Sequence, residues 1–342
     1  MKSRDRSRDA MVDFSASGET PQLWARICWH YFKEGQTQEA IAKRLGLTRL
    51  RVNRILNEAR ASGFVQVSIN SPVGACVELE AQLADQYGLE EVIVTPAPPS
   101  GEDERPVVGI AAGEYISAVL PSDGVLGMTW GGTIHAAAQA LRHRQHTTNI
   151  VVSLCGGLAK STQINPYNNA TMFARMLDAE CYYMTAPLVA DSEAMRDALL
   201  ESTSIRTVME LVPSIDVALL SAIDLTADSK LFEYGILSAE QIQSLVESGA
   251  VGDIAGHYLD AEGRPVSHPL NALRVAPPVE AVRQIPKIVL AAGGLQKVAI
   301  IRAGIEAGLC HVLITEERAA EALIAMETIK PIETPETLTK GM

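Results

Sequence analysis

Seven short apolar runs, most of them separated by helical stretches, constrain the fold of this 342-residue chain more than any other feature. The runs lie at residues 91–95, 124–129, 150–154, 181–186, 216–223, 287–292 and 311–315. Between them, helical periodicity is clear at residues 170–179, 194–209 and 298–307. This alternation predicts an α/β fold with a doubly wound parallel sheet flanked by helices. Residues 256–266 are expected to form an inserted hairpin that turns at residues 260–263.

The first 70 residues have a different pattern, and at roughly 150 residues per domain the length itself predicts about two domains. A periodic apolar face at residues 22–33 predicts one helix, and Thr37 and Thr48 are expected to cap a second and a third. The alternating residues 64–69 predict a strand of the winged type. We therefore expect a flexible tail at 1–19, a helix-turn-helix domain at 20–70 and a linker at 71–76. A ligand-binding α/β domain at 77–330 and a C-terminal tail at 331–342 would follow.

The charge of the chain divides at the same place. Lys and Arg number 29 against 41 Asp and Glu, a net charge of -12 that taken alone argues against a nucleic-acid partner. Residues 1–70, however, contain 12 basic and 7 acidic side chains. A basic head on an acidic body indicates a local anion-binding module.

Cysteine usage and the N-terminus bear on the compartment. Five cysteines are scattered without a Cys-x-x-Cys pair, which favours a reduced cytoplasmic protein over a disulfide framework or a zinc site. The charged start of the chain has no apolar stretch behind it, so a signal peptide is not expected. No apolar run approaches the roughly 18–20 residues that cross a bilayer. We expect a soluble, cytoplasmic protein with no metal.

The segment TQEAIAKRLGLTRLRVNRIL (37–56) follows the pattern of a helix-turn-helix. Ala40 is expected to face the partner helix, and Gly46 tolerates the positive φ of the turn. Arginine and asparagine can each form two hydrogen bonds, to guanine and adenine, from a helix in the major groove. The predicted DNA-contacting residues are Thr37, Gln38, Thr48, Arg49, Leu50, Arg51, Asn53 and Arg54, with Lys43, Arg44 and Arg60 placed for phosphates. The alternative is a three-helix bundle with a solvated basic face, but spacing, turn residue and charge placement agree on DNA binding.

Three strand-to-helix junctions carry glycine pairs: GMTWGGT (127–133), LCGGL (154–158) and AAGGLQK (291–297). Glycine lets the backbone approach an anion, and the helix that follows offers free N–H groups. In an open parallel sheet such loops share one edge, where ligands bind. None matches a Walker loop or a dinucleotide fingerprint, and each alone is commonly plain turn chemistry. Together with Lys297 they predict a small phosphorylated or polyhydroxylated ligand.

The predicted effector-binding residues are Thr129, Trp130, Gly131, Gly132, Thr133, Gly156, Gly157, Asn168, Asp191, Asp253, Gly293, Gly294 and Lys297. Among them Asn168, Asp191 and Asp253, with neighbouring Asn169, are candidates for sugar hydroxyls. Asp253 could equally form a turn, and His257 could equally be a structural histidine. No catalytic residue and no cofactor beyond the effector are expected.

At this point the chain resembles the SorC family (SorC/DeoR type) of bacterial transcriptional regulators, from about Leu23 to Met326. Besides the helix-turn-helix segment, the resemblance rests on ARASGFV (59–65), GMTWGGT, SLCGGL (153–158), TAPLVADS (185–192), VGDIAGHYLDAEG (251–263) and AAGGLQKVAIIRAGIEAG (291–308). The order of these motifs along the chain is specific, although each one is loose. The family also includes the repressors of central glycolytic genes.

The resemblance implies a body similar to sugar-phosphate isomerases and glucosamine-phosphate deaminases, without their catalytic duty. It implies that the GMTWGGT loop, through Thr129, Gly131, Gly132 and Thr133, holds a phosphate or its equivalent together with Lys297. Asp253 would then face the hydroxyls of the effector. Trp130 departs from the smaller residues also common at its position, which leaves an unphosphorylated sugar or polyol open as the effector.

The function expected is therefore a DNA-binding regulator of a carbohydrate or polyol catabolic operon, controlled by a sugar, polyol or sugar phosphate. Family members are typically tetramers on DNA, so a homo-oligomer, dimer or tetramer, is expected, with double-stranded operator DNA as its partner. Repression is the expected mode, with activation as the alternative. The rival is a sugar-phosphate isomerase or deaminase with an accessory DNA-binding head, which would need an acid and a base close to the substrate.

Overall fold

The computed structural model describes residues 20–61, 64–65, 72–159 and 164–326. The chain divides into two compact units, Met1–Asn70 and Ser71–Met342, which we call the head and the body. The tails predicted at 1–19 and 331–342 lie outside the described residues.

The head contains the three predicted helices. The first comprises α1 (Pro21–Cys28) and the π-helical turn η1 (Trp29–Lys33), and it is followed by α2 (Gln38–Leu45) and α3 (Arg49–Ala61). Thr37 and Thr48 accept hydrogen bonds from Ala40 N–H and Arg51 N–H, as their predicted capping roles require. Trp24, Ile27, Ile41, Val52, Ile55 and Leu56 form the core between the helices.

Of three further predictions about the head, one is confirmed, one needs correction and one falls mostly outside the described residues. Gly46 adopts the predicted positive φ, 66°, between α2 and α3. Ala40 is exposed, however, and the small buried residue of α2 is Ala42, because the helix turns its 41–42 edge toward the core. Of the strand predicted at 64–69, residues 64 and 65 form a bend and the others are not described.

Helix α4 (Pro72–Tyr87) begins earlier than predicted. The expected linker at 71–76 is therefore helical from Pro72 onward. Proline is favoured in the first turn of a helix because its missing N–H would have no partner there and its φ is already helical.

In the described part of the body, seven parallel strands form one sheet in the order β1-β10-β9-β5-β2-β3-β4. Their bounds are β1 (Glu91–Thr95), β2 (Val125–Met128), β3 (Ile150–Gly157), β4 (Glu180–Pro187), β5 (Val217–Leu220), β9 (Lys287–Ala291) and β10 (Val312–Glu316). Central strands such as β2 and β5 are buried along their whole length, which explains why their sequences are continuous apolar runs.

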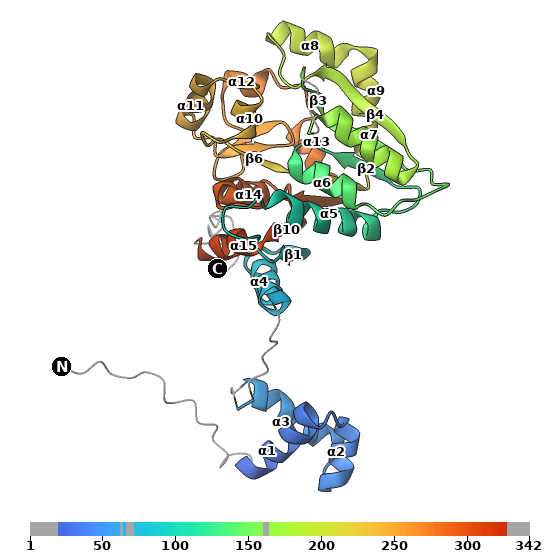
Figure 1. The fold of residues 1–342 in the computed structure, drawn as a ribbon, viewed down its shortest axis with the longest axis vertical. Helices are drawn as coiled ribbons and strands as arrows, with labels where there is room; N and C mark the ends of the chain where they lie inside the picture. Colours follow the sequence, from blue (N-terminus) through green and yellow to red (C-terminus); the bar gives the residue numbers. More distant parts are fainter. Residues whose placement is uncertain (1–19, 62–63, 66–71, 160–163, 327–342) are drawn as a thin grey trace, which may run out of the picture. The chain divides into compact units, whose positions relative to one another are not determined.

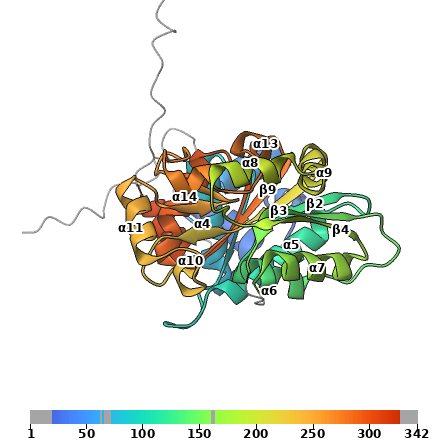
Figure 2. The same ribbon diagram turned by 90° about the horizontal axis from the view of Figure 1, so that it is seen from above.

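Helices cover both faces of this sheet, as the two ribbon views show (Figures 1 and 2). One face carries α5 (Arg105–Val119), α6 (Gly132–Ala140) and α7 (Pro166–Leu177), which share a core with the sheet. The other face carries α4, α9 (Thr203–Leu211), α13 (Val279–Arg283), α14 (Val298–Glu306) and α15 (Glu317–Ala325). The helix predicted at 194–209 is two helices, α8 (Glu193–Glu201) and α9, because Ser202 interrupts it. The predicted doubly wound α/β class is confirmed.

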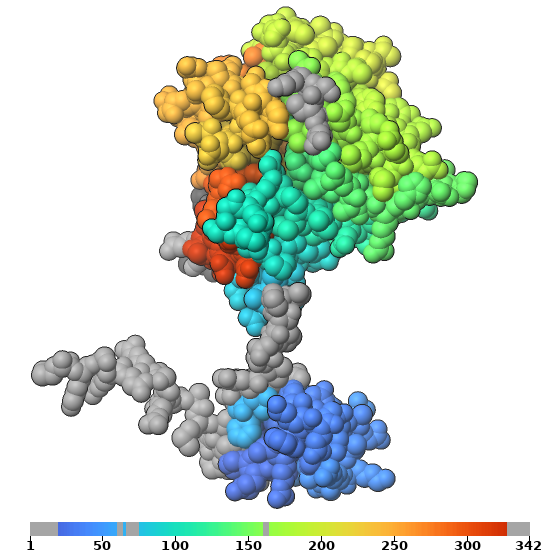
Figure 3. Space-filling view, viewed as in Figure 1, coloured from blue at the N-terminus to red at the C-terminus, as the bar shows by residue number. Residues whose placement is uncertain are grey.

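A small subdomain extends the body beyond the carboxyl ends of the strands. It consists of the antiparallel sheet β6 (Ala222–Asp224), β7 (Gly252–Ile254) and β8 (His257–Leu259), with α10 (Lys230–Glu233), α11 (Ala239–Glu247) and α12 (Pro269–Ala272). It appears as the yellow-to-orange lobe in the space-filling view (Figure 3). The run predicted at 216–223 is thus divided between the two sheets. The predicted 260–263 turn is present beside the bridge of Leu259 with Pro265.

Candidate functional site

The loops that follow β1, β2, β5 and β9 meet at the carboxyl edge of the parallel sheet. The chain continues from β2 to β3 and β4 on one side of the sheet, and from β5 to β9 and β10 on the other. The position where β2 and β5 pair is therefore the topological switch point. In open α/β sheets ligands bind outside this point. Five of the predicted effector residues lie here: Trp130, Gly131, Gly132, Thr133 and Lys297.

Two adjoining cavities open at this edge. The outer cavity has about 700 Å³ and is lined by Gly101, Glu102, Asp103, Glu104, Arg105, Asp224, Thr226, Asp228, Lys230, Gln296 and Lys297. The inner cavity, about 30 Å³, is lined by Arg105, Trp130, Gly131, Gly132, Thr133, Ser221, Ala222, Ile223, Asp224, Lys230 and Lys297. Four charged residues, Arg105, Asp224, Lys230 and Lys297, line both. We call these four residues the neck.

The inner cavity ends at the N-terminus of α6. Gly131 is the N-cap of α6, with φ 121°. Glycine has no side chain that could accept hydrogen bonds from the N–H groups of the first turn of this helix. Those N–H groups have no intrahelical acceptor, so they can face an anion. Thr133 is only 3% exposed, and its hydroxyl has no hydrogen-bond partner among the described residues. The GMTWGGT loop therefore presents donors toward the cavity.

The three cations of the neck are held differently. Lys230 pairs with Glu233 on its own helix, and Arg105 pairs with Asp103. Lys297 has no hydrogen bond or ion pair within the described ranges. Desolvation lowers the pKa of Lys297 below the usual lysine value, although the charge of Asp224 acts against this. The charges of Glu104 and Asp103 act in the same direction as that of Asp224.

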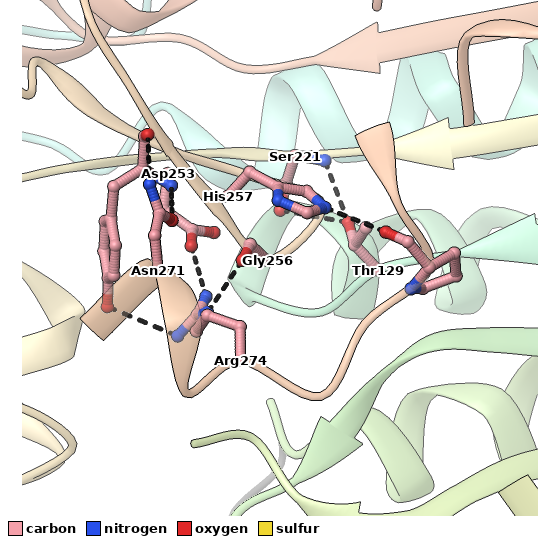
Figure 4. Close-up of polar contacts among 9 residues, drawn as sticks. Thr129, Ser221, Asp253, Gly256, His257, Asn271 and Arg274 are labelled. Atoms are coloured by element: carbon pink, nitrogen blue, oxygen red, sulfur yellow. Dashed lines mark hydrogen bonds and ion pairs between the residues drawn. The ribbon is translucent and has the colours of Figure 1, made fainter. Parts of the chain in front are cut away.

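Thr129 and Trp130 connect the loop to its neighbours. The Ser221 N–H donates to Thr129 Oγ1 (3.0 Å; Figure 4). Ser221 Oγ donates to the Trp130 carbonyl (2.6 Å), and the two contacts fix the β2 loop against the β5 loop. The indole of Trp130 packs into the core of the small subdomain and also lines the inner cavity. Thr129 Oγ1 is therefore already an acceptor within the protein, while Trp130 limits the depth of the cavity.

The glycine pairs at 156–157 and 293–294 do not line the inner cavity. A Cβ on Gly156 would lie 2.4 Å from the Pro187 carbonyl oxygen, and one on Gly157 would lie 2.3 Å from the Tyr167 ring. These two glycines permit close packing and line neither of the two cavities. Gly294 has φ 98°, and its N–H donates to the buried carboxylate of Glu316 (3.2 Å). That contact fixes the 293–297 loop, which carries Lys297.

The predicted hydroxyl-binding side chains do not converge on the neck. Asn168 and Asp191 are exposed and line neither cavity. Asn169, by contrast, is fully buried; it donates to the Gly131 carbonyl (3.3 Å) and its Oδ1 contacts His135 Nδ1 (3.2 Å). Asn169 thus supports the GMTWGGT loop from α7.

Asp253 is buried in the small subdomain and lines neither cavity, so its expected contact with the effector stays a prediction. It is 1% exposed and forms an ion pair with Arg274, which is 4% exposed. Arg274 also donates to the Gly256 carbonyl (2.8 Å) and to the Tyr258 hydroxyl (3.3 Å) (Figure 4). Desolvation raises the pKa of Asp253, and the charge of Arg274 limits the increase.

His257 belongs to the same region and has a structural contact. Its Nε2 lies 2.8 Å from the Pro277 carbonyl oxygen, and burial lowers the pKa of the imidazole. A neutral ring that donates to a carbonyl fits both facts. Of the two readings left open by the sequence, the geometry supports the structural histidine.

The head presents the predicted recognition residues on α3, directly before it, and at the start of α2. Leu50 is 80% exposed at the start of α3, and Arg49 and Arg54 are also exposed. Gln38 Nε2 donates to Asn53 Oδ1 (3.1 Å), which connects α2 to α3. Arg54 contacts Glu58 at 3.6 Å. Exposed Thr37 and Thr48, half-buried Arg51, and exposed Lys43 and Arg44 complete this surface, whereas the Arg60 side chain is not described.

Sequence reasoning missed Asp103, Arg105, Asp224 and Lys230 at the cavity. They come from the loop after β1, the start of α5, the end of β6 and the start of α10, so no local motif joins them. Within the described ranges, no cluster of three His, Cys, Asp or Glu side chains is arranged to hold a metal ion. No helix in the described part of the chain is long and apolar enough to span a bilayer.

The chain matches a family model and several known proteins over most of its length. A family model described as "Putative sugar-binding domain" matches residues 71–325. The chain is 32% identical over 306 residues to the erythritol catabolism regulatory protein EryD of Brucella abortus, covering 88% of this chain and 96% of that protein. It is 32% identical over 314 residues to the transcriptional regulator LsrR of Klebsiella pneumoniae, covering 89% of this chain and 93% of that protein.

A solved structure gives the same result for the fold. The full-length sorbitol operon regulator SorC from Klebsiella pneumoniae superposes with a TM-score of 0.69 at 23% identity, over 89% of this chain and 98% of that chain. The relatives are transcriptional regulators rather than enzymes, which speaks against the isomerase or deaminase alternative. The chain therefore belongs to the SorC family of transcriptional regulators, with its sugar-binding domain at residues 71–325.

Proposed function

We propose that this regulator controls a carbohydrate or polyol catabolic operon, binding operator DNA through the head and a sugar, polyol or sugar phosphate through the body. It acts as a homo-oligomer, a dimer or tetramer, in which the effector changes operator affinity, and repression is its expected mode. The relatives named for erythritol catabolism and for the sorbitol operon support this class of target.

One observation carries the proposal. Lys297 and the hydroxyl of Thr133, which have no hydrogen-bond partner among the described residues, line one cavity at the switch point of the sheet with the N-terminus of α6, where no side chain caps the helix. Such a set binds an anionic or strongly polar group of a small molecule. The described contacts of Asp253 and His257 are internal, so these two residues do not offer the neck the acid–base pair that an isomerase requires.

Control of DNA binding then follows from linkage. A ligand shifts an equilibrium between two arrangements only by its difference in affinity for them. An effector that binds one arrangement of the body better changes operator affinity by that factor, and operator DNA changes effector affinity equally.

A thermal-shift screen of sugars, polyols and their phosphates on the full-length protein tests the effector half of the proposal. A specific ligand raises the melting temperature because it binds the folded state alone. Lys297→Met is expected to abolish the shift. The matched control is Lys287→Met, since Lys287 lies at the opposite end of β9 and pairs with Glu90 on the surface. Equal loss of the shift in both variants, or no shift with any compound, would contradict the proposal.

A further inference from the structure

The first turn of α15 begins with a glutamate cap. Glu316 ends β10 and is the N-cap of α15, and its carboxylate accepts hydrogen bonds from the N–H groups of Arg318 (2.7 Å) and Ala319 (2.8 Å). Helices are usually capped by the shorter side chains of Ser, Thr, Asp and Asn. Glutamate is one methylene longer than aspartate, so its carboxylate can reach beyond the helix that it caps.

The extra length brings Glu316 to the loop after β9. Its Oε1 also accepts from the Gly294 N–H (3.2 Å), and the residue is 2% exposed. A Cβ on Gly293 would lie 3.0 Å from Glu316 Cγ, and Gly293 has no positive φ, so its missing side chain makes room for the glutamate. One buried carboxylate thus joins the start of α15 to the 293–297 loop, which lines the outer cavity with Gln296 and Lys297.

The next two residues of α15 hold a second loop of the same cavity. Arg318 Nη2 donates to the Pro98 carbonyl (2.7 Å), and the Glu317 carboxylate accepts from the Ala97 N–H (3.5 Å). Both acceptor and donor lie in the loop at 96–104, between β1 and α5, whose residues 101–104 line the outer cavity. Residues 316–318, which we call the junction, therefore contact both loops.

The helix that begins at the junction packs against α4 (Figure 1). Tyr87 Oη at the end of α4 donates to the Leu323 carbonyl (2.7 Å), and Leu83 and Leu323 are fully buried in the same core. Burial, and next the charge of Glu317, raise the pKa of Cys76, which places the junction beside the N-terminal half of α4.

That half of α4 is joined directly to the head by the chain. The head ends at Asn70, and α4 begins at Pro72. Packed interiors transmit displacement because they contain few voids and compress little. A movement of either cavity loop would therefore shift α15, and α15 would shift the helix on which the chain leaves the body.

We propose that the junction couples the effector cavity to α4 and, through the chain before Pro72, to the DNA-binding head. Glu316 and Arg318 are positioning residues that act through the 293–297 and 96–104 loops. This inference rests on the proposed function and deepens it, because it names the contacts by which effector and operator influence one another.

Operator DNA alone tests the coupling, because linkage between two sites is reciprocal. Hydrogen–deuterium exchange of the full-length protein is measured with and without a duplex of its own promoter region. We expect the duplex to change exchange in α4, in α15 and in both cavity loops. A change confined to the head, or changed loops with unchanged α4, would overturn the inference.

Two variants separate the loops. Glu316→Asp keeps the charge and the helix cap but withdraws the carboxylate from Gly294. It should reduce the DNA-induced change at 293–297 roughly 2- to 30-fold and preserve the change at 96–104. Arg318→Gln should do the reverse, in part, because Glu317 still holds Ala97. Promoter affinity itself should persist in both variants.

Glu321→Asp is the matched control, since it removes one methylene from an exposed carboxylate of the same helix and should alter neither loop. A lower melting temperature in Glu316→Asp, with both DNA-induced changes intact, would show that Glu316 only stabilises the body and would overturn its positioning role. Equal loss at both loops in Glu316→Asp and Arg318→Gln would contradict separate contacts. If promoter DNA is preferred but the loops do not respond, this inference fails while the proposed DNA binding stands; if no preference exists, the proposed function itself fails.

Discussion

Replacing Asp253 with asparagine is expected to destabilise the body rather than to remove an effector contact. Asp253 and Arg274 are 1% and 4% exposed, so the variant leaves a buried guanidinium without its counter-charge. Breaking a buried pair from one side costs about 3–5 kcal/mol. At about 2–4 °C per kcal/mol for a domain of this size, the melting temperature should fall by roughly 6–20 °C.

The reciprocal variant, Arg274→Met, should cost at least as much. It leaves the Asp253 carboxylate buried alone and also removes a donor from the Gly256 carbonyl. Its penalty depends on pH. The carboxyl without its partner has a folded-state pKa above the unfolded value, so stability is lost as pH rises and is recovered as pH falls toward about 4.

The assay is calorimetric or circular-dichroism melting of the full-length variants between about pH 5 and pH 8. The double variant Asp253→Asn/Arg274→Met should be more stable than the sum of the two single losses predicts, because neither charge is left unpaired. Arg264→Met removes an exposed arginine from a turn and should leave the melting temperature nearly unchanged. A stable Asp253→Asn variant that no longer binds effector would refute the structural role and restore the contact expected from the sequence.

Three further predictions concern the head, the cavity and the packing of the body. Arg51→Ala should weaken operator binding by about 1–3 kcal/mol and relax its sequence preference, whereas Lys43→Ala should weaken all duplexes alike and reduce the salt slope by about 1, both measured by fluorescence anisotropy. Desolvation lowers the pKa of Lys297, so above that pKa the amine is mostly neutral. Binding of an anionic effector then favours the charged amine, and Lys297 takes up a proton from solution. Effector affinity measured by calorimetry should therefore fall as pH rises through that range, with proton uptake visible in buffers of different ionisation enthalpy; a flat profile would contradict this. Gly157→Ala should cost about 1–3 kcal/mol in urea unfolding because its Cβ overlaps the Tyr167 ring, and a neutral result would show that the ring moves freely.

The sheet could be predicted from the sequence because its strands are buried on both faces and read as continuous apolar runs. The helix-turn-helix could be predicted equally well, because Thr37, Gly46 and Thr48 act on the backbone of neighbouring residues. Two helix ends were not predicted, at Ser202 within the predicted 194–209 helix and at Pro72, where α4 begins. Serine and proline are both common at helix termini, but the periodicity of apolar residues does not reveal such ends.

The site was less predictable because its residues meet only through tertiary structure. The partner of Asp253, Arg274, lies 21 positions away in the segment after α12, so the sequence could show an aspartate in a turn-like setting but not its ion pair. Arg105 reaches the neck from α5, where no local motif marks it. Lys297 and the GMTWGGT loop were found because glycine-rich strand ends meet at one edge of a parallel sheet.

The most direct test of the central account is the affinity of the full-length protein for its own promoter region, with and without a ligand found in the screen. We expect salt-dependent binding that prefers this DNA to a scrambled duplex of equal length, and an affinity that shifts with the ligand. In Lys297→Met the preference should persist while the shift disappears. Equal affinity for promoter and scrambled DNA, or an operator affinity that no cavity ligand alters, would contradict the account.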